Sequence, residues 1–280
     1  MGILARVYLW RAGYPINGGT EDYKKAAEWA GKVVATNQHR LNPDLYAMWK
    51  CMATDKYDTE YNESMWEVEF IGNREGDGQG IYTDGRIGNV IGNLQKCTAN
   101  PGKGYSYAFY APTLILWDLY DAADKRRDVY IAPYQINNKD VEVAWKDNQI
   151  VQRSCGKFRR EWETSSMKHK NYTPENYPVL RYSDVLLMQA EAENEANNGP
   201  TDKAYKAINT VRERAGLEAL KNLDYATFQQ EVRDERAREL CFESLRKSEQ
   251  LIVGCDYFRY IYELCFSFRV SSDNVEAEDD

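Results

Sequence analysis

The sequence contains few of the residues on which common catalytic and metal sites depend. Histidine occurs only twice in 280 residues, as His39 and His169, and both stand in polar stretches that predict loops. A Ser-His-Asp or Cys-His catalytic group is therefore weakly supported, and no Cys/His spacing suits zinc. No apolar run approaches the length of a membrane-spanning helix. We expect no metal ion and no cofactor.

Phosphate-binding motifs and excess positive charge are also missing from the sequence. The glycine-rich stretch 76–80 lacks the third glycine of a dinucleotide-binding motif, and Asp77 lacks the alternating acidic partners of a calcium loop. Lys and Arg number 36 against 44 Asp and Glu, which gives a net charge of −8. Nucleic acid is therefore not an expected partner, because binding to its phosphates requires a basic face.

The cysteines do not show the spacing of a disulfide framework or a metal site. We expect them to be reduced and mostly buried, because free cysteine packs as a small hydrophobic residue. The six are Cys51, Cys97, Cys155, Cys241, Cys255 and Cys265.

Tyrosine and tryptophan, by contrast, are plentiful. The chain has 21 Tyr and 7 Trp, more than a helical core requires, within an ordinary globular composition of 43% hydrophobic and 29% charged residues. Both side chains combine an apolar ring face with a polar edge. Sugar rings present the same pair of surfaces, so this composition suits carbohydrate binding.

Residues 181–217 carry the clearest secondary-structure pattern, two helices joined by a short turn. In the first helix Val185 and Met188 recur at helical spacing, and Ser183 is the expected N-cap. Asn198-Gly199 is expected to end this helix, because glycine adopts the left-handed conformation at little cost.

The second helix of this pair is expected to follow Pro200, whose missing N–H is not needed at a helix start. Its apolar stripe consists of Ala204, Ala207, Ile208, Val211 and Ala215, and Gly216 closes it. We expect Ala207 and Val211 to be buried between the two helices. An antiparallel pair of this kind is typical of tetratricopeptide-like repeats.

Three other stretches toward the N-terminus have a readable pattern. Residues 1–38 predict another helical pair, and residues 63–71 alternate as a short strand. Residues 72–105 hold nine of the eighteen glycines and predict a long irregular loop. One face of the first helix of the N-terminal pair is expected to be lined by Ile3, Leu4, Val7, Tyr8 and Arg11.

A last helix is predicted over residues 224–247. Asp224 is its expected N-cap, and Phe228 and Val232 begin its apolar stripe. The spacing also predicts two i,i+4 ion pairs, one between Asp234 and Arg238 and the other between Glu243 and Lys247.

The helical pair closely resembles the signature of the SusD/RagB family. Arg181-Tyr-Ser-Asp-Val-Leu-Leu-Met-Gln-Ala-Glu-Ala-Glu-Asn-Glu-Ala is similar to the family's Arg-Tyr-Ala-Asp-Val-Leu-Leu-Met-x-Ala-Glu-Ala-x-Asn-Glu. The continuation through Ala204–Leu217 matches as well. Arg233-Asp-Glu-Arg-Ala-Arg-Glu-Leu-Cys-Phe-Glu243 resembles a further family segment, after which the likeness stops. The resemblance implies a SusD-like domain over 1–247 and a divergent tail of unknown role over 248–280.

This resemblance implies both a fold and a function. The expected fold is mainly α-helical, with tetratricopeptide-like hairpins, long irregular loops and a few short strands. The expected function is non-catalytic binding of an oligosaccharide or polysaccharide by a surface-exposed lipoprotein of the outer membrane. Family members pass the glycan to a TonB-dependent, SusC-like transporter. Because a signal and a lipidation cysteine are not seen at the start of this sequence, we expect it to be a piece of a longer protein.

Two other functions stay open at this point. A tetratricopeptide-like scaffold could bind proteins without having a sugar site. A glycoside hydrolase would need two carboxylates facing each other across a cleft. The acidic side chains that could supply them are Glu67, Glu69, Asp118, Asp121 and Asp124, but such coincidences are expected among 44 acidic residues.

The candidate carbohydrate-binding residues are aromatic side chains within and near the glycine-rich stretch. For any one of them alone, packing in the core or a loop is the more common role. Nearby polar groups, namely Asp84, Asn89 and Asn93, are expected to bind sugar hydroxyls. The aromatic candidates are Tyr82, Tyr105, Tyr107, Tyr110 and Trp145.

Overall fold

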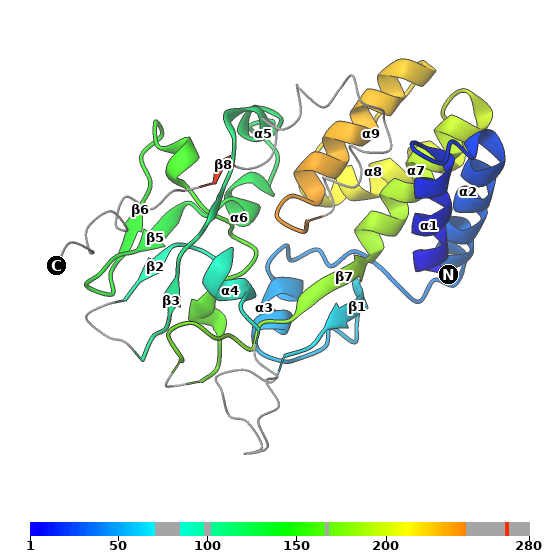
Figure 1. The fold of residues 1–280 in the computed structure, drawn as a ribbon. Coiled ribbons are helices and arrows are strands. Elements are labelled where there is room, and N and C mark those ends of the chain that lie inside the picture. Colours follow the sequence, from blue (N-terminus) through cyan, green and yellow to red (C-terminus); the bar gives the residue numbers. More distant parts are fainter. Residues whose placement is uncertain (71–84, 98–101, 166–167, 245–266, 269–280) are drawn as a thin grey trace.

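The computed structural model describes residues 1–70, 85–97, 102–165, 168–244 and 267–268. The longer helices gather on one side of the molecule, and most of the short strands lie on the other (Figure 1). The predicted class, a mainly helical chain with a few short strands, is confirmed. No helix in these ranges is both long enough and apolar enough to cross a membrane.

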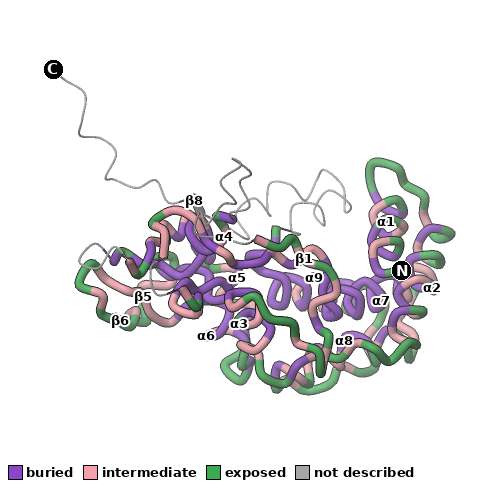
Figure 2. The backbone as a smooth tube through the Cα atoms, turned by 90° about the horizontal axis from the view of Figure 1, so that it is seen from below, coloured by how far each residue is buried: buried purple, intermediate pink, exposed green. Residues whose placement is uncertain are grey.

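Helix α7 is the centre of the helical side. It packs against α2, α8 and α9 and is buried along most of its length (Figure 2). Small side chains let these helices approach closely, because Ala26, Ala30, Ala190 and Ala204 are all fully buried. The longer helices of the described ranges are α1 (Gly2–Ala12), α2 (Gly19–Ala35), α7 (Tyr182–Asn197), α8 (Asp202–Ala215) and α9 (Tyr225–Glu239).

The predicted hairpin corresponds to α7 and α8. Ala207 and Val211 are 2% and 0% exposed, which confirms that both are buried. The N-cap prediction is wrong, because Arg181 occupies that position and the Ser183 hydroxyl is buried without a hydrogen-bond partner. At the other end Asn198, rather than the glycine after it, adopts the left-handed conformation.

The face predicted for α1 only partly coincides with the buried one, since Ile3 and Tyr8 pack partly buried against the helical core. Leu4 and Val7 are 41% and 44% exposed, whereas Gly2, Ala5 and Leu9 are buried. Close packing explains the difference, since a Cβ at Gly2 would lie 2.6 Å from Leu180 Cδ2. The side of α1 with the smallest residues therefore faces its neighbours.

The strands form small sheets. β1 (Ser64–Val68) pairs antiparallel with β7 (Tyr177–Arg181), which confirms the predicted strand within 63–71. β4 (Tyr110–Ala111) pairs with β8 (Ser267–Phe268). The third sheet has the order β3-β2-β5-β6 and contains β2 (Gln95–Lys96), β3 (Tyr105–Ser106), β5 (Tyr134–Ile136) and β6 (Glu142–Ala144).

Short helices and a second apolar cluster support these strands. The cluster is separate from the helical core and includes Trp49, Met52, Leu116, Tyr130 and Phe158. The short α-helices are α3 (Ala47–Ala53), α4 (Ile87–Val90), α5 (Leu114–Asp118) and α6 (Arg127–Tyr130), and two 3₁₀ turns cover Ile150–Gln152 and Arg160–Trp162.

The prediction of one irregular loop over 72–105 is wrong in the part that can be described. Residues 71–84 and 98–101 lie outside the described ranges, but α4 and β2 lie between them. These short elements are held by tertiary hydrogen bonds that local periodicity does not reveal. The Asn93 amide, for example, donates to the Phe158 carbonyl at 2.8 Å.

A buried ionic network joins the two apolar clusters. Arg181, fully buried between β7 and α7, donates to Glu239 at 3.1 Å and to Glu243 at 2.8 Å. Burial alone would raise the pKa of Glu239, but Arg214, Arg181 and Arg126 hold it well below its usual value. Glu239 is therefore a fully buried carboxylate that stays charged because cations surround it.

The ion pair predicted between Asp234 and Arg238 is wrong, because Arg238 pairs with Glu235 at 2.8 Å. The pair predicted between Glu243 and Lys247 stays a prediction, since residue 247 lies outside the described ranges. Within those ranges Glu243 pairs with Lys157 and Arg181 from distant parts of the chain. Helical spacing predicts neighbours on an exposed surface, whereas these side chains point into the protein interior. The expected N-cap Asp224 and the buried Phe228 and Val232 are confirmed.

The cysteines agree with the prediction as far as they are described. Cys97, Cys155 and Cys241 are free and buried, and Cys51 is free and half-buried. Burial raises the pKa of the Cys97 thiol to about 11 and that of Cys155 to about 12, so both thiols are protonated at neutral pH. Cys255 and Cys265 lie outside the described residues.

Candidate functional site

Three aromatic rings follow one another along the segment that begins at β3. Tyr105, Tyr107 and Phe109 are half-buried, while Ser106 and Ala108 between them are fully buried. The ring centroids of Tyr105 and Tyr107 are 4.6 Å apart, and those of Tyr107 and Phe109 are 5.3 Å apart. The last two rings are parallel within 2°. Alternation from β3 onward places the rings of Tyr105 and Tyr107 on the same side, and Phe109 follows after Ala108, whose φ is +50°. We refer to these three residues as the aromatic row.

Helix α4 holds the backbone of the aromatic row in place. The amides of Tyr107 and Phe109 donate to the carbonyls of Asn89 and Val90 at 2.8 and 2.9 Å. The Asn89 side-chain amide in turn donates to the Tyr105 carbonyl at 2.8 Å. These bonds satisfy buried backbone groups and fix the direction in which the rings point.

Arg160 joins the aromatic row to a second loop. Its guanidinium is fully buried and donates to four backbone carbonyls, each at 2.9 Å, those of Tyr105, His169, Lys170 and Tyr172. It also forms an ion pair with Glu163, with Nε 2.7 Å from Oε1. Gly104 has a φ of +79°, and a Cβ there would lie 2.6 Å from the guanidinium carbon. Only glycine satisfies both conditions without strain.

The second loop supplies polar side chains beside the rings. Lys170 Nζ lies 5.6 Å from the centre of the Tyr105 ring, and the Tyr107 hydroxyl is 3.5 Å from Asn171 Oδ1. His169 lies against Tyr172, with ring centroids 4.7 Å apart. Apolar ring faces with an amide and an ammonium group at their edge can bind a sugar ring by stacking and by hydrogen bonds to its hydroxyls.

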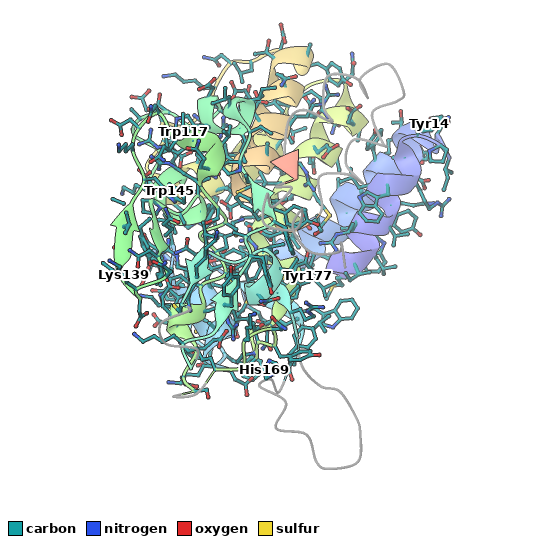
Figure 3. The ribbon with its side chains drawn as sticks, turned by 60° about the vertical axis from the view of Figure 1, so that its left-hand side comes forward. Tyr14, Trp117, Lys139, Trp145, His169 and Tyr177 are labelled. Atoms are coloured by element: carbon teal, nitrogen blue, oxygen red, sulfur yellow. The ribbon has the colours of Figure 1, made fainter. Side chains whose placement is uncertain are left out.

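Of the predicted site residues, the structure brings Tyr105 and Tyr107 together. Tyr110 belongs to β4 and packs partly against the second apolar cluster. Trp145 follows β6, at the opposite edge of the sheet from β3, which corresponds to a separation of about 14 Å across three strand spacings. Figure 3 likewise shows Trp145 apart from His169, the labelled residue of the second loop. Tyr82 lies outside the described residues.

The polar groups proposed for sugar hydroxyls need correction. Asn89 and Asn93 are fully buried in the protein interior, so their side chains are not accessible to a ligand. Asp84 lies outside the described residues. Sequence reasoning also missed Phe109, although its alternation with Tyr105 and Tyr107 was a usable signal. Asn171, distant in sequence, gave no such signal.

The carboxylates considered for glycoside hydrolysis do not face one another. Glu67 lies on β1 and Asp118 on α5, and these elements lie on opposite sides of the molecule (Figure 1). Asp124 is fully buried and bonded to Arg126 at 2.7 Å. Within the ranges that the structure describes, no group of three His, Cys, Asp or Glu side chains is arranged to hold a metal ion.

Comparison with known proteins gives a consistent result. The model of the SusD family matches residues 134–249. SusD-like protein P2 of Formosa agariphila is 28% identical over 261 residues, covering 87% of this chain and 48% of the relative. The crystal structure of a SusD homolog from Bacteroides thetaiotaomicron superposes with a TM-score of 0.80 at 27% identity, covering 94% of this chain and 54% of that one.

A more distant structure shares the fold. Surface glycan-binding protein A from Bacteroides thetaiotaomicron, solved in complex with laminarihexaose, superposes with a TM-score of 0.63 at 17% identity, covering 95% of this chain and 58% of that one. The chain spans about half the length of the curated relatives it matches. In the signature of α7 and α8, in its helical architecture and in these comparisons, the chain is similar to proteins of the SusD/RagB family.

Proposed function

We propose that this protein binds a glycan without cleaving it, and that the aromatic row takes part in the binding site. The observation that carries the proposal is the set of three neighbouring rings with Lys170 and Asn171 at their edge. Support comes from the family and from a structural neighbour that was solved with laminarihexaose. Tyr82, Tyr110 and Trp145 remain predicted contacts.

Replacing Tyr107 with alanine tests this proposal. The variant is expected to lose about 1 kcal/mol or more of binding free energy, because the ring face for stacking is removed. Retention would be measured by electrophoresis in gels that contain neutral polysaccharides. Trp66, which is 54% exposed on β1, provides a matched control, and its alanine variant should bind like the parent. Unchanged binding by the alanine variants of both Tyr107 and Phe109 would place the site elsewhere.

The same assay separates the other two functions. A protein-binding scaffold would show no retention by any polysaccharide, and a glycoside hydrolase would release shorter products. The separation of the candidate carboxylates favours binding over hydrolysis.

We further propose that the whole protein is a surface-exposed lipoprotein of the outer membrane that delivers glycan to a TonB-dependent, SusC-like transporter. The family resemblance and the rigid helical side support this proposal, since a stable complex buries on the order of 2,000 Å². The test is purification of the full-length protein from native membranes. Recovery without any associated transporter would contradict it.

A further inference from the structure

A groove on the helical side is separate from the aromatic row. Helices α2 and α8 both pack on α7, and the groove that they border has a volume of about 1280 Å³. Figure 1 shows these helices on the other side of the molecule from β3. Small or apolar side chains make up much of its lining, among them Ala27, Gly31, Leu186, Ala196 and Ala207.

Gln189 of α7 gives this groove a polar group without a partner. Its side chain lines the groove although the residue is only 6% exposed. Its amide makes no hydrogen bond to any residue in the described ranges, so its donors and acceptor are free to bind a ligand in the groove. A carboxamide offers one acceptor and two donors, which complement the N–H and C=O of a peptide group. The amide lies close to Gly31 of α2, where a Cβ would be in van der Waals contact with Nε2 at 3.5 Å.

Basic side chains outnumber acidic ones in the lining of the same groove, seven against three. Arg40, Lys125 and Lys206 are exposed, line it, and form no ion pair with a described residue. Another lining lysine, Lys32, is already paired with Glu28 at 2.6 Å. Unpaired cations on one face of a chain with a net charge of −8 complement an acidic partner.

The lining favours a peptide over a glycan. The aromatic lining residues are His39 and Tyr182, and Tyr182 is buried, so the groove offers little ring surface for stacking a sugar. Alanine and glycine along the walls instead leave room for an extended main chain with small side chains.

We propose that this groove binds an extended acidic peptide segment of a partner protein. The segment's main chain pairs with Gln189, its small side chains lie against Ala27 and Ala207, and its carboxylates face Arg40, Lys125 and Lys206. This site is distinct from the aromatic row, so either proposal can fail alone.

The test uses a fluorescein-labelled peptide of alternating aspartate and alanine, with alternating lysine and alanine as the comparison peptide. Fluorescence anisotropy should show binding of the acidic peptide only. Gln189→Ala should weaken binding about three- to tenfold, the value of one neutral hydrogen bond. Lys206→Glu should weaken it further, and more at low salt than at high salt, because exposed charges are screened.

A matched control is Lys139→Glu, the same charge change at an exposed lysine between β5 and β6, apart from the helices (Figure 3). This variant should bind the peptide like the parent. Because Lys206 is exposed, its variant is expected to fold, which circular dichroism verifies. No binding of the acidic peptide, or equal loss in the Lys139 and Lys206 variants, would overturn the proposal. Binding of polygalacturonate instead, weakened by Lys206→Glu, would replace it with an anionic-glycan site.

Discussion

Replacing Arg160 with methionine should disorganise the loops that carry the aromatic row. The guanidinium is fully buried, and four backbone carbonyls and Glu163 accept hydrogen bonds from it. Methionine fills part of the volume but leaves the Glu163 carboxylate buried without its cation. Breaking a buried pair in this way costs about 3–5 kcal/mol, and the four carbonyls also lose their buried donor.

A loss of that size is a large fraction of the roughly 5–15 kcal/mol that stabilises a typical domain. We therefore expect a lower urea midpoint by tryptophan fluorescence, together with faster amide exchange in residues 102–110 and 168–173. Glycan retention should fall as well, because the Tyr105 carbonyl loses a buried donor. The helical side, with its separate core, should keep its protection from exchange.

The double variant Arg160→Met, Glu163→Gln separates charge from positioning. It should regain the part of the stability that was lost to the stranded carboxylate, but not glycan retention, since the four carbonyls stay unpaired. If Arg160→Met alone unfolds at the parent's urea concentration and retains glycan normally, the role assigned to Arg160 is refuted.

Three further results are expected. Glu239→Gln should cost about 3–5 kcal/mol in urea unfolding, because it removes the charge that neutralises buried arginines, and a parental midpoint would contradict this. Burial raises the pKa of Glu175 well above 4.5, so the folded protein holds a proton there that the unfolded chain releases as the pH rises past 4.5. Stability should therefore fall by up to about 1.4 kcal/mol per pH unit above 4.5, and Glu175→Gln should flatten the decline in melting temperature as the pH rises. Ala207→Phe should destabilise by about 1–3 kcal/mol through overpacking, and an unchanged melting temperature would count against close α7–α8 packing.

The helical hairpin was predictable because its signals are local. Ala207 and Val211 repeat at helical spacing, and Gly216 takes the left-handed conformation with a φ of +82°. The face of α1 was not predictable in the same way. There the choice depends on the room that Leu180 leaves at Gly2, which is a property of the neighbouring strand.

The candidate site was predictable only in part, for a related reason. Tyr105 and Tyr107 stand two residues apart, so an extended segment suffices to place them together. Asn171 reaches Tyr107 from 64 residues further along the chain, through a loop positioned by Arg160. Contacts of that kind depend on tertiary hydrogen bonds, which periodicity and composition do not record.

The direct passage from β7 into α7 affects how the molecule can move. The strand ends at Arg181 and the helix begins at Tyr182, so no linker lies between the two apolar clusters at this point. Arg181 is also anchored by Glu63, Glu239 and Glu243, which come from both sides of the junction. A hinge needs a few residues that can change their backbone angles freely. At this junction every residue belongs to the strand or to the helix. A displacement of the helices is therefore transmitted directly through α7 and β7 to the strands, and the helical side and the strand side move together.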